Sequence, residues 1–358
     1  MTLLRSLVAG RLLRHESFHA VESLVCSPAR QAMGVRRTFG DDVLGYFTER
    51  LDVHRLREAI VGIVRQAKRN KAFQESRWIG LALDGTGAGR SRDKQCPECR
   101  PVKNDDDKIV GYHHCVVMAS VVGTTLSLPI DVEPYGPGDS EYSAGQRLLP
   151  RVKENLGSRF CDYVVVDGKF ATAPFLHTVG ETGLRVVARL KQNLPELYDA
   201  AERRFRSLPA QQTFRDGADR VEIWDEDDFD PWESLRWDTV RVIRYLQHKP
   251  GGEVVEAYWL TDWPKVKAGS QALYHMAKSR WEIENQGFND AKNRYGFEHI
   301  CHHHPNSILI VWLIIALTMT LERLYRNRYL HRGFHNVLEP AQLLLLLQIS
   351  LGRQLNSS

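Results

Sequence analysis

The chain has 358 residues, of which 43% are hydrophobic, and its Lys and Arg residues exceed its Asp and Glu residues by 48 − 44 = 4. This hydrophobic content is ordinary for a globular protein of one or two domains. The mildly positive balance is compatible with a nucleic-acid partner but does not predict one, because the clustering of charge matters more than its sum. Six cysteines without regular spacing indicate a reducing compartment, so we expect a cytoplasmic protein.

Membrane and export segments are not expected. The longest apolar run, residues 308–321, is shorter than the roughly 20 residues of a spanning helix, so we predict a buried core helix. Arginines are spread through the first 18 residues and no small-residue cleavage site follows a long apolar core. This start is therefore interpreted as a helix and not as a signal peptide.

Residues 1–75 are predicted to form a helical N-terminal region. Apolar positions spaced by three and four between residues 40 and 70 are typical of an amphipathic helix. The helix ends in a basic cluster, RQAKRNK, at residues 65–71. A solvated helix end and a contact to the DNA backbone are both compatible with this cluster.

Residues 76–195 have the pattern of a mixed sheet flanked by helices. The expected elements are a strand at 78–83, a hairpin of two strands at 112–135, a helix at 140–157, a strand at 162–167, a helix at 173–183 and a strand at 184–191. Strands that alternate with helices in this way favour an α/β fold.

Residues 196–266 are predicted to be a β-rich insertion. Three segments are strand-like, at 220–225, 239–248 and 254–262, and a KPGG hairpin turn joins the last two. Helical patterns return in residues 267–332, and the leucine-rich residues 333–358 are expected to form a helical tail.

Two aspartates share one context. Asp84 and Asp167 each follow an apolar, strand-like run and each precede a glycine. A carboxylate at the end of such a strand projects into the crevice where open α/β sheets bind ligands. The alternative is that Asp-Gly is simply a common turn. Two carboxylates can hold a hard divalent cation such as Mg²⁺, which prefers oxygen ligands.

A third carboxylate lies on a later helix, within RWEIENQGFNDAKNRYG at residues 280–296. Trp281, Phe288 and Tyr295 recur at steps of seven and give this segment an apolar stripe. With Glu284 as third ligand, two ions could activate the attacking oxygen and stabilise the leaving oxygen of a phosphodiester. Arg280, one turn earlier, could steady Glu284 or meet a phosphate. The alternative is that Glu284 is an ordinary solvated helix residue.

Together the segments LALDGTG, VVVDGKF and RWEIEN resemble the DDE transposases of the insertion-sequence-four kind. In that family one Asp ends the first strand of a ribonuclease-H-like core, a second ends the fourth, and a Glu follows a β-rich insertion. The separations here are 167 − 84 = 83 and 284 − 167 = 117 residues, and the second leaves room for that insertion. The resemblance covers roughly residues 36–332.

The resemblance implies an α/β, ribonuclease-H-like fold and a DNA transposase. Asp84, Asp167 and Glu284 would hold two Mg²⁺ or Mn²⁺ ions, while Arg280, Lys292 and Lys169 would contact DNA phosphates. The implied partners are double-stranded DNA with terminal inverted repeats, target DNA and a second copy of the chain, since two element ends are handled together.

The sequence departs from the family pattern at two positions. The usual Tyr is replaced by Ala277, with Tyr274 one turn earlier, and Lys292 follows Glu284 one residue late. At about 100° per residue, an α-helix would turn Lys292 away from its expected line. These departures leave two alternatives open: a DNA-binding remnant or regulator without chemistry, and a metal-dependent nuclease without strand transfer.

A separate pattern, CPEC, contains Cys96 and Cys99 in a polar loop. The pair is a candidate half of a structural zinc site, which needs four ligands. Candidate partners are His113, His114 and Cys115 or the CHHH run at 301–304. The alternative is a pair of free thiols. If zinc is bound, it would hold the loop that follows Asp84.

Overall fold

The computed structural model describes residues 2–330 and 339–356. The N-terminal region is helical, as expected, with α1 at Thr2–Leu12, α2 at Phe18–Cys26, α3 at Ala29–Ala32, α4 at Asp41–Arg50 and α5 at Val53–Arg69. Asp52 begins α5 because its carboxylate accepts the backbone N–H of His54 at 2.8 Å. The apolar face of α5, including Ile60 and Val64, is fully buried.

Ten strands of the described residues form one mixed sheet. They are β1 at Gly80–Ser91, β2 at Arg100–Lys103, β3 at Ile109–Val122, β4 at Leu128–Tyr135, β5 at Tyr163–Val166, β6 at Arg185–Leu190, β7 at Gln212–Asp216, β8 at Asp219–Phe229, β9 at Val240–His248 and β10 at Val254–Thr261. Their order is β2-β3-β1-β5-β6-β10-β9-β8-β7, and β4 also pairs with β3. Strands β1, β5 and β6 are mutually parallel, whereas β3 and β4 run antiparallel to their neighbours.

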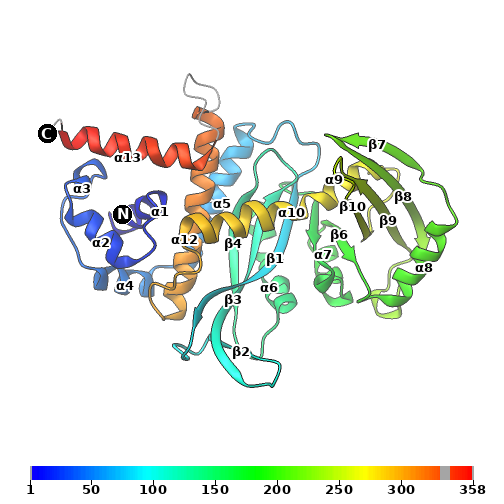
Figure 1. Ribbon diagram of the computed structural model, residues 1–358, viewed down its shortest axis with the longest axis horizontal. Coiled ribbons are helices and arrows are strands. Elements are labelled where there is room, and N and C mark those ends of the chain that lie inside the picture. Colours follow the sequence, from blue (N-terminus) through cyan, green and yellow to red (C-terminus); the bar gives the residue numbers. More distant parts are fainter. Residues whose placement is uncertain (1, 331–338, 357–358) are drawn as a thin grey trace.

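The core of this sheet is ribonuclease-H-like, and the predicted fold class is confirmed. The β-rich insertion before the Glu284 helix is also present, but it does not form a separate sheet. Its last strand, β10, pairs with β6 and so extends the core sheet. The segment also contains a helix that the sequence analysis did not predict, α8 at Pro195–Arg206. Figure 1 shows these strands at the opposite end of the molecule from the N-terminal helices.

Helices complete the core. They are α6 at Glu141–Leu156, α7 at Ala173–Glu181, α9 at Ser270–Lys278, α10 at Arg280–Glu282, α11 at Asp290–Tyr295, α12 at Pro305–Tyr325 and α13 at Pro340–Asn356. A π-helix at Ile283–Asn289 joins α10 to α11. The segment from α9 to α11 runs across the middle of the molecule, between the N-terminal helices and the insertion (Figure 1).

Helix α12 is the buried core helix that the sequence predicted, although it is longer than the apolar run. It contacts β4, α5, α4 and α1. By length and composition alone, Pro305–Arg328 could cross a membrane, but 83% of its apolar window is buried inside the protein. The expected C-terminal helix corresponds to α13, and residues 331–338 lie outside the described residues.

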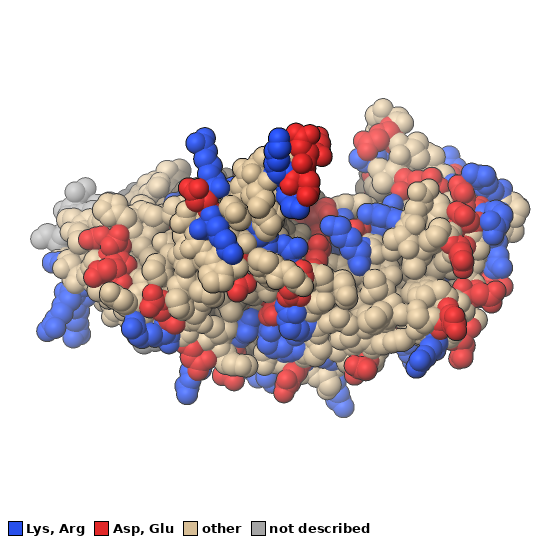
Figure 2. All heavy atoms as spheres, turned by 90° about the horizontal axis from the view of Figure 1, so that it is seen from below, with Lys and Arg blue, Asp and Glu red and all other residues tan. Residues whose placement is uncertain are grey.

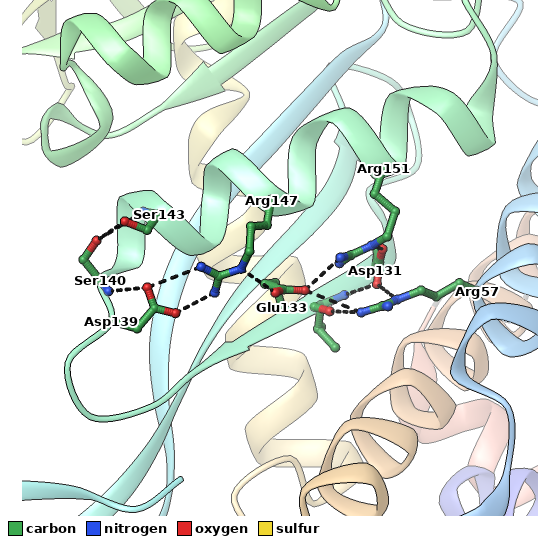
Figure 3. A network of polar contacts seen from close by, with 9 residues as sticks. Arg57, Asp131, Glu133, Asp139, Ser140, Ser143, Arg147 and Arg151 are labelled. Atoms are coloured by element: carbon green, nitrogen blue, oxygen red, sulfur yellow. Dashed lines mark hydrogen bonds and ion pairs between the residues drawn. The ribbon is translucent and has the colours of Figure 1, made fainter.

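The first turn of α6 is held by a chain of ion pairs that reaches back to α5 (Figure 3). The charged members come from α5, from β4 and its following loop, and from α6: Arg57, Asp131, Glu133, Asp139, Arg147 and Arg151. Asp131 is 1% exposed, and its two carboxylate oxygens accept from Arg57 Nε at 2.8 Å and Arg151 Nε at 2.9 Å. Ser140 caps the helix. The network therefore fixes the turn that carries Glu141.

Candidate active site

Asp84 and Asp167 lie side by side on neighbouring strands. The parallel pairing of β1 with β5 ends at Leu83 and Val166, and an aspartate directly follows each of these two residues in the chain. Neighbouring strands are about 4.8 Å apart, so both carboxylates belong to one edge of the parallel core. The buried apolar runs before them, which predicted strands, produce this placement.

One detail of the sequence analysis was wrong: Asp84 does not end its strand. β1 continues to Ser91, and Asp84 is paired with Met118 of β3. Only the parallel pairing with β5 stops before Asp84, because β5 ends at Val166 while β3 continues as an antiparallel partner. The glycines that suggested a turn are accommodated inside a long antiparallel ribbon.

Arg280 connects the first aspartate to the glutamate of the distant helix. Its Nη1 lies 3.4 Å from Asp84 Oδ2, and its Nη2 donates to Glu284 Oε1 at 2.8 Å. The Arg280 side chain is 9% exposed, whereas the Glu284 side chain is 41% exposed. A buried guanidinium thus lies between two carboxylates that are 284 − 84 = 200 residues apart in the chain. Although Glu284 is partly exposed, its carboxylate is bound by Arg280.

The environment of Asp84 disfavours its charged form. Burial raises the pKa of Asp84 to about 6, and the nearby carboxylates of Glu284 and Glu141 also act to raise it. Arg280 and the backbone N–H of Gly85, which donates to Asp84 Oδ1 at 2.9 Å, oppose this rise. The rise is therefore mainly an effect of burial, and a cation bound beside Asp84 would stabilise its charged form.

Asp167 has its own cationic partner, which the sequence analysis did not identify. Lys191, just after β6, has its Nζ 2.9 Å from Asp167 Oδ1. Burial alone would raise the pKa of Asp167, but the Lys191 hydrogen bond, the N–H of Gly168 and the charge of Arg280 together lower it. Asp167 is thus ionised in the ligand-free protein. Its position opposite the end of β6 was the signal that could have suggested Lys191.

A fourth carboxylate, that of Glu141, lies at the same edge. A methyl group on Gly85 would lie 2.5 Å from the Glu141 carboxyl carbon, so the Glu141 side chain packs directly against the backbone that follows Asp84. Lys169 Nζ lies 3.5 Å from Glu141 Oε2, with the lysine side chain 74% exposed. Lys169 therefore lies beside Glu141, and its predicted contact with DNA stays a prediction. Glu141 was missed because an acidic residue in the first turn of a helix is also explained by the helix dipole.

The helix that carries Glu284 is not uniformly α-helical. Its Ile283–Asn289 segment is a π-helix, in which hydrogen bonds span five residues instead of four. The segment therefore takes up one more residue per turn than an α-helix. In the family pattern, the lysine follows the glutamate by seven positions, whereas Lys292 follows Glu284 by eight. Because the π segment has more residues per turn, the eighth residue after Glu284 should face about the direction that the seventh would face in an α-helix. The sequence analysis assumed α-helical winding when it expected Lys292 to turn away from the family position. The π-helix removes that assumption.

Lys292 is partly exposed and pairs with Glu298, whose Oε1 lies 3.2 Å from its Nζ. Tyr274, the nearest tyrosine to the family position, is instead buried, and its hydroxyl donates to Asp216 Oδ2 at 2.8 Å. Ala277 is also fully buried. The tyrosine of the family pattern therefore has no surface counterpart at either position.

The donor set fits a hard divalent cation. Asp84, Asp167, Glu284 and Glu141 offer only carboxylate oxygens, which Mg²⁺ and Mn²⁺ prefer. The positively charged guanidinium of Arg280 already lies between two of these carboxylates, those of Asp84 and Glu284. A bound metal would therefore meet a site that attracts positive charge.

The predicted Cys96–Cys99 pair lies apart from these carboxylates. The structure brings it to His114 and His303, one partner from each of the two predicted sets. His113, by contrast, lies near Gly87, and Cys115 lies beside Tyr135.

On the face shown in Figure 2, positive charge does not form a continuous surface. In Figure 2, Lys and Arg side chains alternate with Asp and Glu side chains over the visible surface. In the basic cluster at the end of α5, Lys68 donates to the backbone carbonyls of Arg159 and Phe160. At least this lysine of the cluster therefore has a role within the protein.

The strand order and the paired acidic residues define a ribonuclease-H-like protein. Residues 77–321 match the family described as "Transposase DDE domain", and this match covers about two thirds of the chain. The chain therefore belongs to that family, which is one of DNA transposases and implies the use of a divalent metal.

The fold is also similar to a solved structure. The cryo-EM structure of a piggyBac transposase synaptic complex with hairpin DNA matches with a TM-score of 0.51 at 13% identity, over 99% of this chain and 70% of that chain. A likeness at this identity concerns the fold alone. No curated protein matches the chain.

Proposed function

We propose that the protein is an active transposase of an insertion sequence, which cleaves the ends of its element and joins them to target DNA with Mg²⁺ or Mn²⁺. The observation that carries this proposal is the double contact of Arg280 with Asp84 and Glu284, beside Asp167. Asp84, Asp167 and Glu284 are separated by 83 and 117 positions, and they support the proposal because Arg280 contacts two of them and its charge lowers the pKa of Asp167. The grouping with the insertion-sequence-four kind is part of the proposal.

Asp84, Asp167 and Glu284 would hold two metal ions, which supply activation of the attacking oxygen and stabilisation of the leaving oxygen. Arg280 would keep the Asp84 and Glu284 carboxylates oriented and would reduce their mutual repulsion. Lys169 and Lys292 would contact phosphates on either side of the scissile bond. Because both element ends are cut together, two copies of the chain would act on one pair of ends.

The test uses purified protein, Mg²⁺ or Mn²⁺, and DNA that carries the inverted repeats flanking its gene. Cleavage followed by joining to a second DNA supports transposition. Cleavage without joining would instead support a nuclease, and binding without cleavage would support a DNA-binding remnant. The missing family tyrosine and the shifted Lys292 motivate the DNA-binding remnant.

Lys292→Ala is expected to weaken DNA binding at all sequences and to lower the slope of log affinity against log salt by about one, because one phosphate contact is lost. Lys292→Arg should retain most of the affinity. The measurement is fluorescence anisotropy at several salt concentrations. Arg294→Ala is the matched control, since Arg294 belongs to the same helix and pairs with Asp290. Equal losses in the two alanine variants would contradict the role of Lys292.

A further inference from the structure

Four soft ligands lie together away from the carboxylates: Cys96, Cys99, His114 and His303. One ligand atom from each residue lies within 4.8 Å of all the others. The first two belong to the loop between β1 and β2, His114 belongs to β3, and His303 directly precedes the cap of α12. Three separate segments of the chain therefore meet at this cluster.

The distances match a tetrahedral zinc site. With Zn–S of about 2.3 Å and Zn–N of about 2.0–2.1 Å, tetrahedral geometry sets sulfur atoms about 3.8 Å apart and sulfur and nitrogen atoms about 3.6 Å apart. The two Sγ atoms are 3.7 Å apart, and Cys99 Sγ lies 3.6 Å from His114 Nε2. Cys96 Sγ is closer to that nitrogen, at 3.1 Å. The separation of the two sulfur atoms is far too long for a disulfide bond, which needs about 2.05 Å.

The burial and the chemistry of these four side chains also fit a zinc site. Cys96, Cys99 and His114 are buried, while His303 closes the cluster from the surface. Thiolate and imidazole are the ligands that Zn²⁺ prefers, and a full set of four protein ligands is typical of a structural site without an open position. Neighbouring His302 is engaged elsewhere, because its Nε2 lies 2.8 Å from Glu49 Oε1.

We propose that Cys96, Cys99, His114 and His303 bind one structural Zn²⁺ ion. The ion joins the β1–β2 loop and β3 to the segment that links the Glu284 helix to α12. β1 carries Asp84 and is paired with β3 through Ala88 and His114. The zinc thus connects the strand of the first aspartate to the segment between the helix of the glutamate and α12. This site is independent of the carboxylates and of the proposed transposition.

The test is the metal content of the full-length protein, purified under reducing conditions without chelator and supplied with Zn²⁺. We expect one zinc per chain by mass spectrometry. Replacement by Co²⁺ should give the intense visible absorption of a tetrahedral site and a thiolate-to-cobalt charge-transfer band. Asp84→Asn should leave both readouts unchanged, because it alters only the carboxylate site.

Matched variants identify the ligands. Cys99→Ser and His303→Ala should reduce the zinc content at least fivefold and change the cobalt spectrum, and Cys115→Ser and His304→Ala should leave both near wild type. His303 is exposed, so its replacement by alanine leaves no cavity in the core. A wild-type zinc content below about 0.2 per chain, or equal losses in the ligand and control variants, would overturn the proposal.

Discussion

Asp84→Asn is expected to lower DNA cleavage more than roughly a thousandfold while DNA affinity stays within about twofold. A metal ligand at the reacting phosphate contributes several kcal/mol to the transition state, and about 4 kcal/mol corresponds to this factor. Asparagine has the same shape and still accepts the Gly85 N–H bond. The measurement compares single-turnover cleavage and equilibrium binding on the same DNA. Cleavage at the wild-type rate would exclude the proposed site.

The same substitution should stabilise the metal-free fold at neutral pH. Burial raises the pKa of Asp84 to about 6 from its ordinary 3.8, so the folded state holds this proton more tightly than the unfolded state does. The stability that Asp84 contributes is complete below pH 3.8, falls as the pH rises towards 6 and stays low above that. The asparagine side chain of the variant does not titrate, and the expected gain above about pH 6 is roughly 3 kcal/mol.

Urea unfolding of wild type and Asp84→Asn at about pH 4.5 and about pH 7.5, without added Mg²⁺ or Mn²⁺, measures this difference. The advantage of the variant should be larger at the higher pH. Added Mg²⁺ should then stabilise the wild type and not the variant, because binding requires the ionised carboxylate. An advantage that is the same at both pH values would contradict the raised pKa. Gain of stability with loss of cleavage is the signature of a residue kept for function.

Arg241→Met is expected to destabilise the protein by about 3–5 kcal/mol, the largest loss that we predict for any single substitution. Arg241 and Asp225 are buried, and Arg241 Nε donates to Asp225 Oδ1 at 2.7 Å. The guanidinium also donates to the carbonyls of Trp263 and Ala268 at 2.9 and 2.8 Å. Its removal leaves a buried carboxylate and two carbonyls without their donor.

The consequence reaches the active site, because Ala268 directly precedes the α9 segment that leads to Arg280. The Ser270 hydroxyl also donates to Asp225, so the pair holds the insertion strands against the start of that helix. Denaturant unfolding measures the loss. Arg220→Met is the control on β8, since its ion pair with Glu222 is exposed and should contribute at most about 1 kcal/mol.

Adding Asp225→Leu to Arg241→Met should recover much of the stability, because a buried ion pair can often be replaced by apolar side chains without loss. If Arg241→Met were no more damaging than Arg220→Met, the buried pair would not hold the insertion in place.

The candidate site could be predicted from the sequence only in part. Asp84 and Asp167 were identifiable because each follows a buried strand, and Glu284 because the resemblance assigned it. Glu141 and Lys191 were not, since an acid in a first helical turn and a lysine after a strand are common everywhere. The proposed zinc ligands show the same limit. Cys96 and Cys99 are marked by local spacing, but the choice of His114 and His303 depends on how distant segments pack.

The sequence by itself predicted eight of the ten described strands, the buried helix α12 and the β-rich insertion, because hydrophobic periodicity acts locally. It did not predict the short strands β2 and β7. The apolar runs before Asp84 and Asp167 pointed to these two residues, and the family resemblance pointed to Glu284. Only the tertiary structure decided that β10 continues the core sheet through β6 and that Arg280 lies between Asp84 and Glu284. It also decided that residues 283–289 wind as a π-helix, so the α-helical angle between Glu284 and Lys292 does not apply. The physical reason is that strand register and helix winding are set by packing across the whole core, so contacts between remote side chains have no local signature.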